Sequence, residues 1–213
     1  SERGIIADHD GQPVQEYLLQ IYKVTLHGQK AIEQFLSLST QEEQPRQPLQ
    51  ISVAVQSSIN TFRKDLPSTI SLQSDITANL GMIAGNSIQI QQVIINLCTN
   101  AKEAMLATGG LLEIGLTLTD IPIERTRHHS DLASEKHVKL TITDSGLGMD
   151  RDQLEHIFEP FYTTKNSKDG RGLGLSLTHQ IVKNHAGCIY VNSIVGVGTT
   201  FTILFPLLAP SGE

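Results

Sequence analysis

The chain has 213 residues, of which 39% are hydrophobic, and a formal net charge of −6, enough length for one good core plus a smaller element. Its lysines and arginines are scattered, which argues against nucleic acid as a partner, because phosphate binding needs a concentrated basic face. No apolar run approaches 18 residues, so we expect no membrane contact by this chain.

The first periodic segment predicts one long amphipathic helix over residues 14–40. Its stripe of apolar and small residues recurs at three- and four-residue steps: Tyr17, Leu18, Ile21, Val24, Gly28, Ala31, Ile32, Phe35 and Leu38. A helix of this length needs a partner helix. Residues 41–48 are polar and contain two prolines, which predicts a linker.

Beyond the linker we expect short elements: a strand at 49–51, a helix at 52–65, and strands at 70–76 and 80–84. The next helix, 86–106, has an apolar face and a second face that carries Gln92, Asn96, Asn100 and Glu103. Most such faces are only solvated. Asparagine is a mediocre helix former, however, and its neutral carbonyl oxygens suit Mg²⁺ in the company of phosphate and water.

A strand is predicted at 111–119, then a polar, irregular segment at 120–136, then an alternating strand at 138–143. The last strand ends in Asp144-Ser145-Gly146-Leu147-Gly148-Met149. A carboxylate there can accept a hydrogen bond from an exocyclic amine, and glycines let a flat ring approach the backbone. Taken alone, the same residues also suit a plain turn.

The two histidines of the irregular segment and the two cysteines suggest no metal site. His128 and His129 have no partners at ligand spacing, and Cys98 and Cys188 lie in apolar periodic segments. We expect both cysteines to be buried free thiols of a reducing cytoplasm.

A short helix is predicted at 150–158, followed by the aromatic segment 158–165, which proline interrupts. This segment is either a hydrophobic staple for a loop or the hinge of a mobile lid that ends in Lys165. Glycines spaced by two then lead into a helix at 176–185. Such a helix start exposes N–H groups to an anion, although the glycines also suit a tight turn. A hairpin, 188–204 with a glycine turn, closes the pattern.

In this order the segments resemble the ATP-binding domain of bacterial sensor histidine kinases, in the wider group of Hsp90, DNA gyrase B and MutL. The resemblance covers about residues 49–209. The matching motifs are the N box at 96–105, the G1 box at 144–149, the F box at 158–161, the G2 box at 170–175 and the Gly-x-Gly-Thr hairpin. It implies an α+β fold, a two-layer α/β sandwich in which helices cover one face of a mixed sheet.

The resemblance also implies residue roles. Asp144 should bind the adenine amino group, with Gly146 and Gly148 making room for the ring. Asn100 should ligate Mg²⁺ that bridges the phosphates, assisted by Asn96. The remaining candidates should line the phosphates: Lys165, Gly170, Arg171, Gly172, Leu173, Gly174 and Leu175.

Two further assignments follow from the same resemblance. Thr199 or Thr200 should complete the adenine network through water, and we take Thr200 as the candidate. Asn96, Asn100 and Lys165 are the candidate catalytic residues. Hydrolytic relatives carry a water-activating glutamate where Asn96 stands, and an amide cannot accept that proton, which favours transfer to an acceptor over hydrolysis. The Asn-Ala-x-Glu-Ala-Met form resembles the nitrogen-regulation-like branch.

The N-terminal region departs from the kinase pattern, which requires a phosphoacceptor histidine on the first helix of a dimerising hairpin. His9 stands beside Gly11 and Pro13, a poor helical context, and His27 lies inside the long helix, which resembles the second helix of that hairpin. We therefore expect an acceptor upstream of residue 1, a partial dimerisation and phosphotransfer region at 1–48 and a catalytic domain at 49–213.

The leading hypothesis is a cytoplasmic histidine kinase transmitter. It would bind Mg-ATP, transfer the γ-phosphoryl group to a histidine of the dimerisation helix for relay to a response regulator receiver, and form a homodimer through its N-terminal helices. Two alternatives remain: an ATP-hydrolysing conformational clamp, and a module that binds ATP without kinase activity of its own.

Overall fold

The computed structural model describes residues 18, 46–120, 136–164 and 172–208. All of these except Leu18 belong to one compact unit, Glu43–Glu213. The long helix predicted at 14–40 and the irregular segment at 120–136 lie almost entirely outside the described residues. Within the described residues, no helix is long and apolar enough to cross a membrane.

The unit is built on a five-stranded mixed sheet with the strand order β2-β4-β5-β7-β6. Its strands are β2 (Ile70–Ile76), β4 (Gly110–Asp120), β5 (Lys136–Asp144), β6 (Cys188–Ile194) and β7 (Gly198–Pro206). β2 and β4 run parallel, and the other neighbouring pairs are antiparallel. A small separate sheet pairs β1 (Gln47–Leu49) with β3 (Ile83–Gly85).

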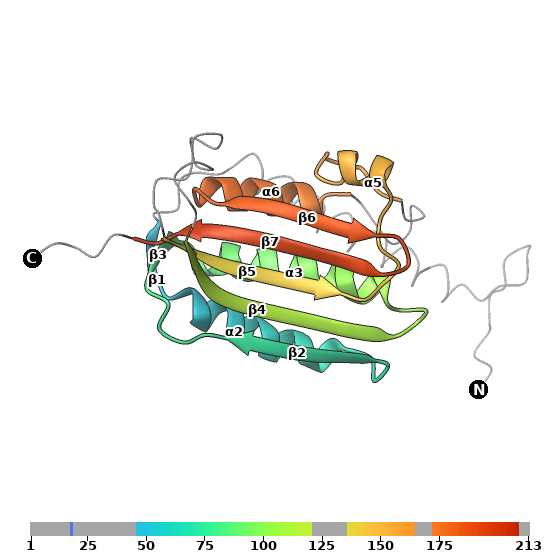
Figure 1. Ribbon diagram of the computed structural model, residues 1–213, viewed down its shortest axis with the longest axis horizontal. Helices are drawn as coiled ribbons and strands as arrows, with labels where there is room; N and C mark the ends of the chain where they lie inside the picture. Colours follow the sequence, from blue (N-terminus) through green and yellow to red (C-terminus); the bar gives the residue numbers. More distant parts are fainter. Residues whose placement is uncertain (1–17, 19–45, 121–135, 165–171, 209–213) are drawn as a thin grey trace, which may run out of the picture. The chain divides into compact units, whose positions relative to one another are not determined.

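Three helices, α2 (Ile51–Phe62), α3 (Ser87–Ala104) and α6 (Gly174–Asn184), lie on one face of the sheet (Figure 1). The short helix α5 (Arg151–His156) lies at one end, and a 3₁₀ turn, η1 (Arg63–Asp65), follows α2. The two-layer sandwich implied by the resemblance is therefore confirmed for the described residues.

The core forms between these helices and the inner face of the sheet, because strand residues alternate between the two faces. Val138, Leu140 and Ile142 of β5 are buried, whereas Lys139, Thr141 and Thr143 are partly exposed. From α3, the apolar stripe supplies the facing side: Ile90, Val93, Ile94, Leu97, Cys98 and Ala101 are all buried. This burial fixes the sheet register, since a slip by one residue would exchange the faces.

Several element boundaries differ from the prediction. Ile51, expected in a strand, is fully buried at the start of α2, and β1 ends at Leu49. β3 begins at Ile83 rather than at residue 80. α6 begins at Gly174 instead of residue 176, which brings the last glycine of the G2 box into the helix. Because β1 includes Gln47 and Pro48, the compact unit begins before the predicted division at 48/49; the role assigned to residues 1–48 stays a prediction.

Candidate nucleotide site

Asp144 is the last residue of β5, and its carboxyl group lies on the helix-covered face of the sheet. The side chain is only 6% exposed, and Oδ1 accepts the N–H of Gly146 at 2.9 Å. Burial raises the pKa of Asp144 above its ordinary value, while the backbone N–H groups of Gly146 and Thr199 oppose part of that rise. A buried carboxylate held by backbone donors can present its remaining acceptor capacity to a ligand.

The glycines after Asp144 are required by close contacts within the protein. A side chain at Gly146 would meet the Cβ of Ala104 at 2.7 Å and Oδ1 of Asp144 at 2.8 Å. Gly148 has a φ of +66°, and a Cβ there would collide with the carbonyl group of Ile194. The structure thus explains both glycines by the packing of the turn, and the role predicted for them at the ring stays a prediction.

The turn also bridges α3 and the β6–β7 hairpin. Leu147 donates its N–H to the carbonyl of Ala104 at 3.3 Å and accepts the N–H of Gly196 at 2.7 Å. These bonds place the G1 turn against the last turn of α3, one helical turn beyond Asn100. The carboxylate and the asparagine-bearing helix are therefore parts of one local structure.

Four residues on neighbouring strands form a rung across the helix-covered face. Thr199 of β7 pairs with Asp144, which also pairs with Leu112 of β4, and Ser193 of β6 pairs with Thr199. Thr199 is 6% exposed. The rung therefore puts a hydroxyl beside the carboxylate, on the sheet face that α3 covers.

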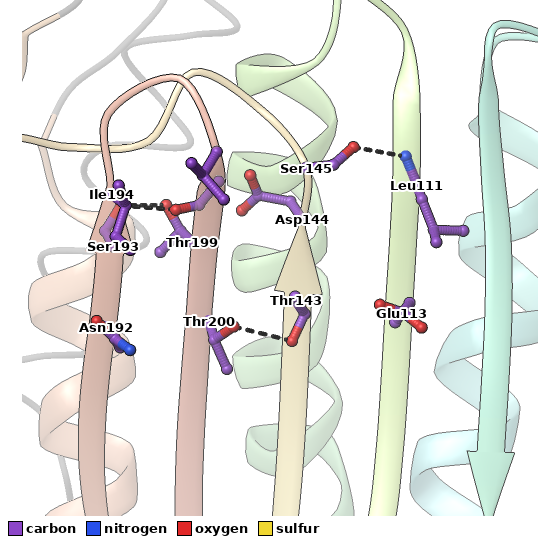
Figure 2. A pocket seen from close by; sticks show the side chains of 12 residues that line it. Leu111, Glu113, Thr143, Asp144, Ser145, Asn192, Ser193, Ile194, Thr199 and Thr200 are labelled. Atoms are coloured by element: carbon purple, nitrogen blue, oxygen red, sulfur yellow. Dashed lines mark hydrogen bonds between the residues drawn. The ribbon is translucent and has the colours of Figure 1, made fainter.

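Thr200 lies on the opposite, open face, because successive strand residues alternate. There its hydroxyl lies 3.1 Å from that of Thr143, and both line a pocket of about 280 Å³ (Figure 2). The lining also includes Glu113, Asn192 and the rung residues Asp144, Ser193 and Thr199, so the pocket itself does not separate the two threonines; the alternation of the strand does. The geometry favours Thr199, and we carry Thr199 forward in place of Thr200 as the partner of Asp144 in the adenine network.

The polar stripe of α3 faces the start of α6. Asn96 Nδ2 donates to the carbonyl of Gly174 at 3.3 Å, and Asn100, one turn further along, is half-buried. Gln92 and Glu103 are half-buried as well. The N box and the G2 box therefore meet at Asn96, as a shared phosphate and metal site requires. Amide oxygens at these positions fit a magnesium ion whose other ligands are phosphate and water.

The start of α6 offers backbone donors to an anion. Leu173 at its N-cap provides no side-chain hydrogen bond to the first-turn N–H groups, and the first turn carries no acidic residue. Leu173 is buried, whereas Gly174 and Leu175 are half-buried. Unpaired N–H groups and the helix dipole favour a phosphate at such a position.

Gly172 connects this helix start to the F box. Its φ is +65°, its carbonyl accepts the N–H of Phe161 at 2.9 Å, and any Cβ would collide with the backbone of Phe161 and Tyr162. Phe158 stacks on His179 of α6, with 5.0 Å between ring centroids. The aromatic segment is thus packed onto α6. Lys165, Gly170 and Arg171 lie outside the described residues, so their predicted phosphate contacts stay predictions.

Ser193 was not singled out from the sequence. In the structure its hydroxyl accepts the N–H of Met149 at 2.8 Å, donates to the carbonyl of Gly198 at 3.0 Å and lies 2.9 Å from Oγ1 of Thr199. A lone serine in a hairpin strand carries no signal of such a role; only the register of β6 against β7 shows it.

Comparisons with known proteins agree with this architecture. A mycobacterial sensor histidine kinase, MprB, superposes with a TM-score of 0.60 at 24% identity, over 76% of this chain and 97% of that one. Full-length ShkA in complex with AMPPNP gives a TM-score of 0.72 at 18% identity, over 97% of this chain and 41% of the other. At these identities the likeness shows the fold alone: an α/β sandwich of the kind found in histidine kinase catalytic domains.

The family comparison identifies the chain more closely. Residues 85–209 match the family described as histidine kinase-, DNA gyrase B- and HSP90-like ATPase, and the chain belongs to this family. The sensor histidine kinase ZraS of Salmonella typhimurium (strain LT2) is 34% identical over 182 residues, 84% of this chain and 35% of the relative. The compact unit is therefore a domain of this ATPase family, similar to the corresponding part of bacterial sensor histidine kinases. The chain spans between 13% and 35% of the length of such relatives.

Proposed function

We propose that this chain is the catalytic part of a cytoplasmic sensor histidine kinase that binds Mg-ATP and transfers its γ-phosphoryl group to a histidine on a dimerisation helix. The phosphoryl group would pass on to an aspartate of a response regulator receiver, and the N-terminal region would form the homodimer. The single observation that carries the proposal is the buried Asp144 carboxylate, held by backbone N–H groups beside α3. The fold relative ShkA was solved in complex with AMPPNP, which supports nucleotide binding by a protein of this fold.

In this proposal Asp144 and Thr199 recognise the adenine edge, and the N–H groups at the start of α6 receive the phosphates. Asn100, with Asn96, would hold the magnesium ion, which supplies positive charge against the phosphates as the transferred group moves. No group of three His, Cys, Asp or Glu side chains in the described ranges could hold a metal by itself. A metal bound jointly by an asparagine and the nucleotide fits these residues.

Asn96 supports transfer over hydrolysis. A neutral amide cannot take the proton of an attacking water molecule, and this side chain already donates to the carbonyl of Gly174. The expected activity is therefore phosphorylation of a histidine in trans with little steady ATP hydrolysis. Rapid hydrolysis without an acceptor would favour the conformational clamp, and ATP binding without any transfer would favour the non-kinase module.

Calorimetry with AMPPNP, with and without Mg²⁺, tests the binding step in the wild type and in Asp144→Asn. Replacing the carboxylate with an amide turns one acceptor oxygen into a donor nitrogen, so we expect affinity to fall by roughly 10- to 150-fold, the range for a hydrogen bond to a charged group. Asp75→Asn makes the same charge change on an exposed residue of β2 and should bind normally. Unchanged affinity in a folded Asp144→Asn variant would refute the proposed site.

A second assay tests the transfer step. A separately supplied dimerisation helix with its histidine is incubated with the chain and γ-labelled ATP, and phosphohistidine is measured by its stability in alkali and lability in acid. Asn100→Ala should abolish the label at saturating ATP if this side chain holds the metal. Full labelling by that variant would contradict the metal assignment.

A further inference from the structure

The hydroxyl of Ser193 belongs to a chain of hydrogen bonds whose direction can be worked out from its partners. The carbonyl oxygen of Gly198 has no proton, so the single hydroxyl proton of Ser193 points to it, at 3.0 Å. The oxygen of Ser193 must then accept at its other contacts. One of these is the backbone N–H of Met149, at 2.8 Å, which can only donate.

The third partner of Ser193 is the hydroxyl of Thr199, at 2.9 Å. Since the proton of Ser193 is committed to Gly198, the proton in this contact comes from Thr199. Thr199 has no other hydroxyl proton, so towards the nucleotide side it can offer lone pairs only. Its neighbour Asp144 is also an acceptor there, because a carboxylate carries no proton.

We propose that Ser193 is a positioning residue that fixes the specificity of the site for a 6-amino purine by holding Thr199 as a hydrogen-bond acceptor. Two adjacent acceptors match an exocyclic amino group, which donates. They oppose a 6-oxo purine, whose oxygen would face lone pairs without an intervening proton. The inference rests on the proposed nucleotide site. It assigns to Ser193, acting through Thr199, the part of the discrimination between 6-amino and 6-oxo purines that Asp144 does not supply.

The same argument says what happens when the hydroxyl of Ser193 is removed. In Ser193→Ala the proton of Thr199 loses its acceptor and the hydroxyl can rotate. It can then donate to a 6-oxo group, directly or through a water molecule. Binding of the 6-oxo nucleotide should improve relative to the 6-amino one, whereas loss of the Met149 anchor alone would weaken both equally.

The experiment measures dissociation constants for AMPPNP and its inosine counterpart in the same buffer, in the wild type and in variants. We expect the preference for the adenine nucleotide to fall about 3- to 10-fold in Ser193→Ala, the value of about one neutral hydrogen bond. Ser193→Thr keeps the hydroxyl and should restore the preference. Asn192→Ala, on the exposed open face of the same strand, is the matched control and should leave it unchanged.

An unchanged preference in folded Ser193→Ala, or an equal loss of both affinities, overturns the inference while leaving the proposed site intact. If Ser193→Ala does not fold, Ser193→Cys replaces it with a weaker hydrogen-bonding group of similar size, and an intermediate preference is expected. A wild type that binds neither nucleotide overturns the proposed function together with the inference. This outcome differs from the others because it is seen in the wild type, before any variant is measured.

Discussion

Two glycines of the site region share a left-handed backbone but differ in what surrounds them, which allows strain and close approach to be measured separately. Gly148 has a φ of +66° and Gly196 a φ of +77°. A Cβ at Gly148 would run into the carbonyl group of Ile194, whereas a Cβ at Gly196 has nothing within 4 Å. We predict that Gly148→Ala destabilises the domain clearly more than Gly196→Ala.

The expected loss in free energy of unfolding is the sum of a backbone-conformation cost and a packing cost. The left-handed conformation costs an L-residue roughly 1–2 kcal/mol, partly offset by roughly 0.4–1 kcal/mol from the lower entropy of the unfolded chain. Both variants share this term, so Gly196→Ala should lose at most about 1.6 kcal/mol. Gly148→Ala adds an overpacking cost of about 1–3 kcal/mol, because the backbone of Ile194 cannot rotate away.

Urea unfolding of both variants and the wild type measures the difference in free energy of unfolding. The domain is small enough for a two-state treatment if fluorescence and circular dichroism transitions coincide. Gly148→Ala should also weaken AMPPNP binding, because the turn it displaces holds Asp144. Equal stabilities for the two variants would show that the turn does not lie against the hairpin as described.

Two further predictions concern buried titratable groups. His185 is 3% exposed; its Nε2 accepts the N–H of Asn86 and its Nδ1 contacts the carbonyl of Ile181, an arrangement that suits the neutral ring. Burial lowers the pKa of His185, and the charge of Arg46 lowers it further. The unfolded chain therefore protonates this histidine more readily than the folded domain does, and stability should fall as the pH drops below the ordinary histidine pKa of about 6.5. Urea unfolding at pH 7.5 and 5.5 should show that His185→Gln loses less free energy of unfolding between the two pH values than the wild type does. An identical loss in both proteins would contradict this prediction. Burial raises the pKa of Cys98 to about 12, which leaves roughly one thiolate in ten thousand at pH 8, so a thiol reagent should modify Cys98 only on unfolding. Because Cys188 is a half-buried free thiol, the labelled position is identified by peptide mapping, and labelling of Cys98 in the folded domain would refute the prediction.

The longer elements could be predicted because each carries several periods of its pattern. β2 was expected at 70–76 and spans Ile70–Ile76, and α3 matches its expected range to within two residues at each end. β1 and β3 have three residues each, too few for alternation to locate their ends. The buried face of α2 begins at Ile51, and a single apolar residue at a boundary suits a strand as well as a helix.

The choice between Thr199 and Thr200 could not be made from the sequence for a related reason. Two adjacent threonines on a strand necessarily face opposite ways, and which one faces Asp144 depends on the register of β7 against β5. Gly198 fixes that register: its φ of +136° and the absence of a side chain let β7 begin directly against the carbonyl group of Asp144. Sequence spacing identifies the motif but not which of its two threonines shares a sheet face with Asp144.

The burial of Asp144 supports the proposal that its carboxylate serves a ligand rather than the fold. Because burial raises the pKa of Asp144 above the ordinary 3.8, the folded domain holds this proton more tightly than the unfolded chain does. Stability therefore falls as the pH rises through the interval between the two values, and the ionised group is a cost to the fold at neutral pH. The backbone N–H groups that oppose the shift reduce this cost without removing it. A residue chosen for stability at the end of β5 would be apolar like its rung neighbour Leu112, which is fully buried. In the proposed site, a carboxylate there, with Thr199 and Ser193 completing its rung, would be explained by a donor group of the nucleotide.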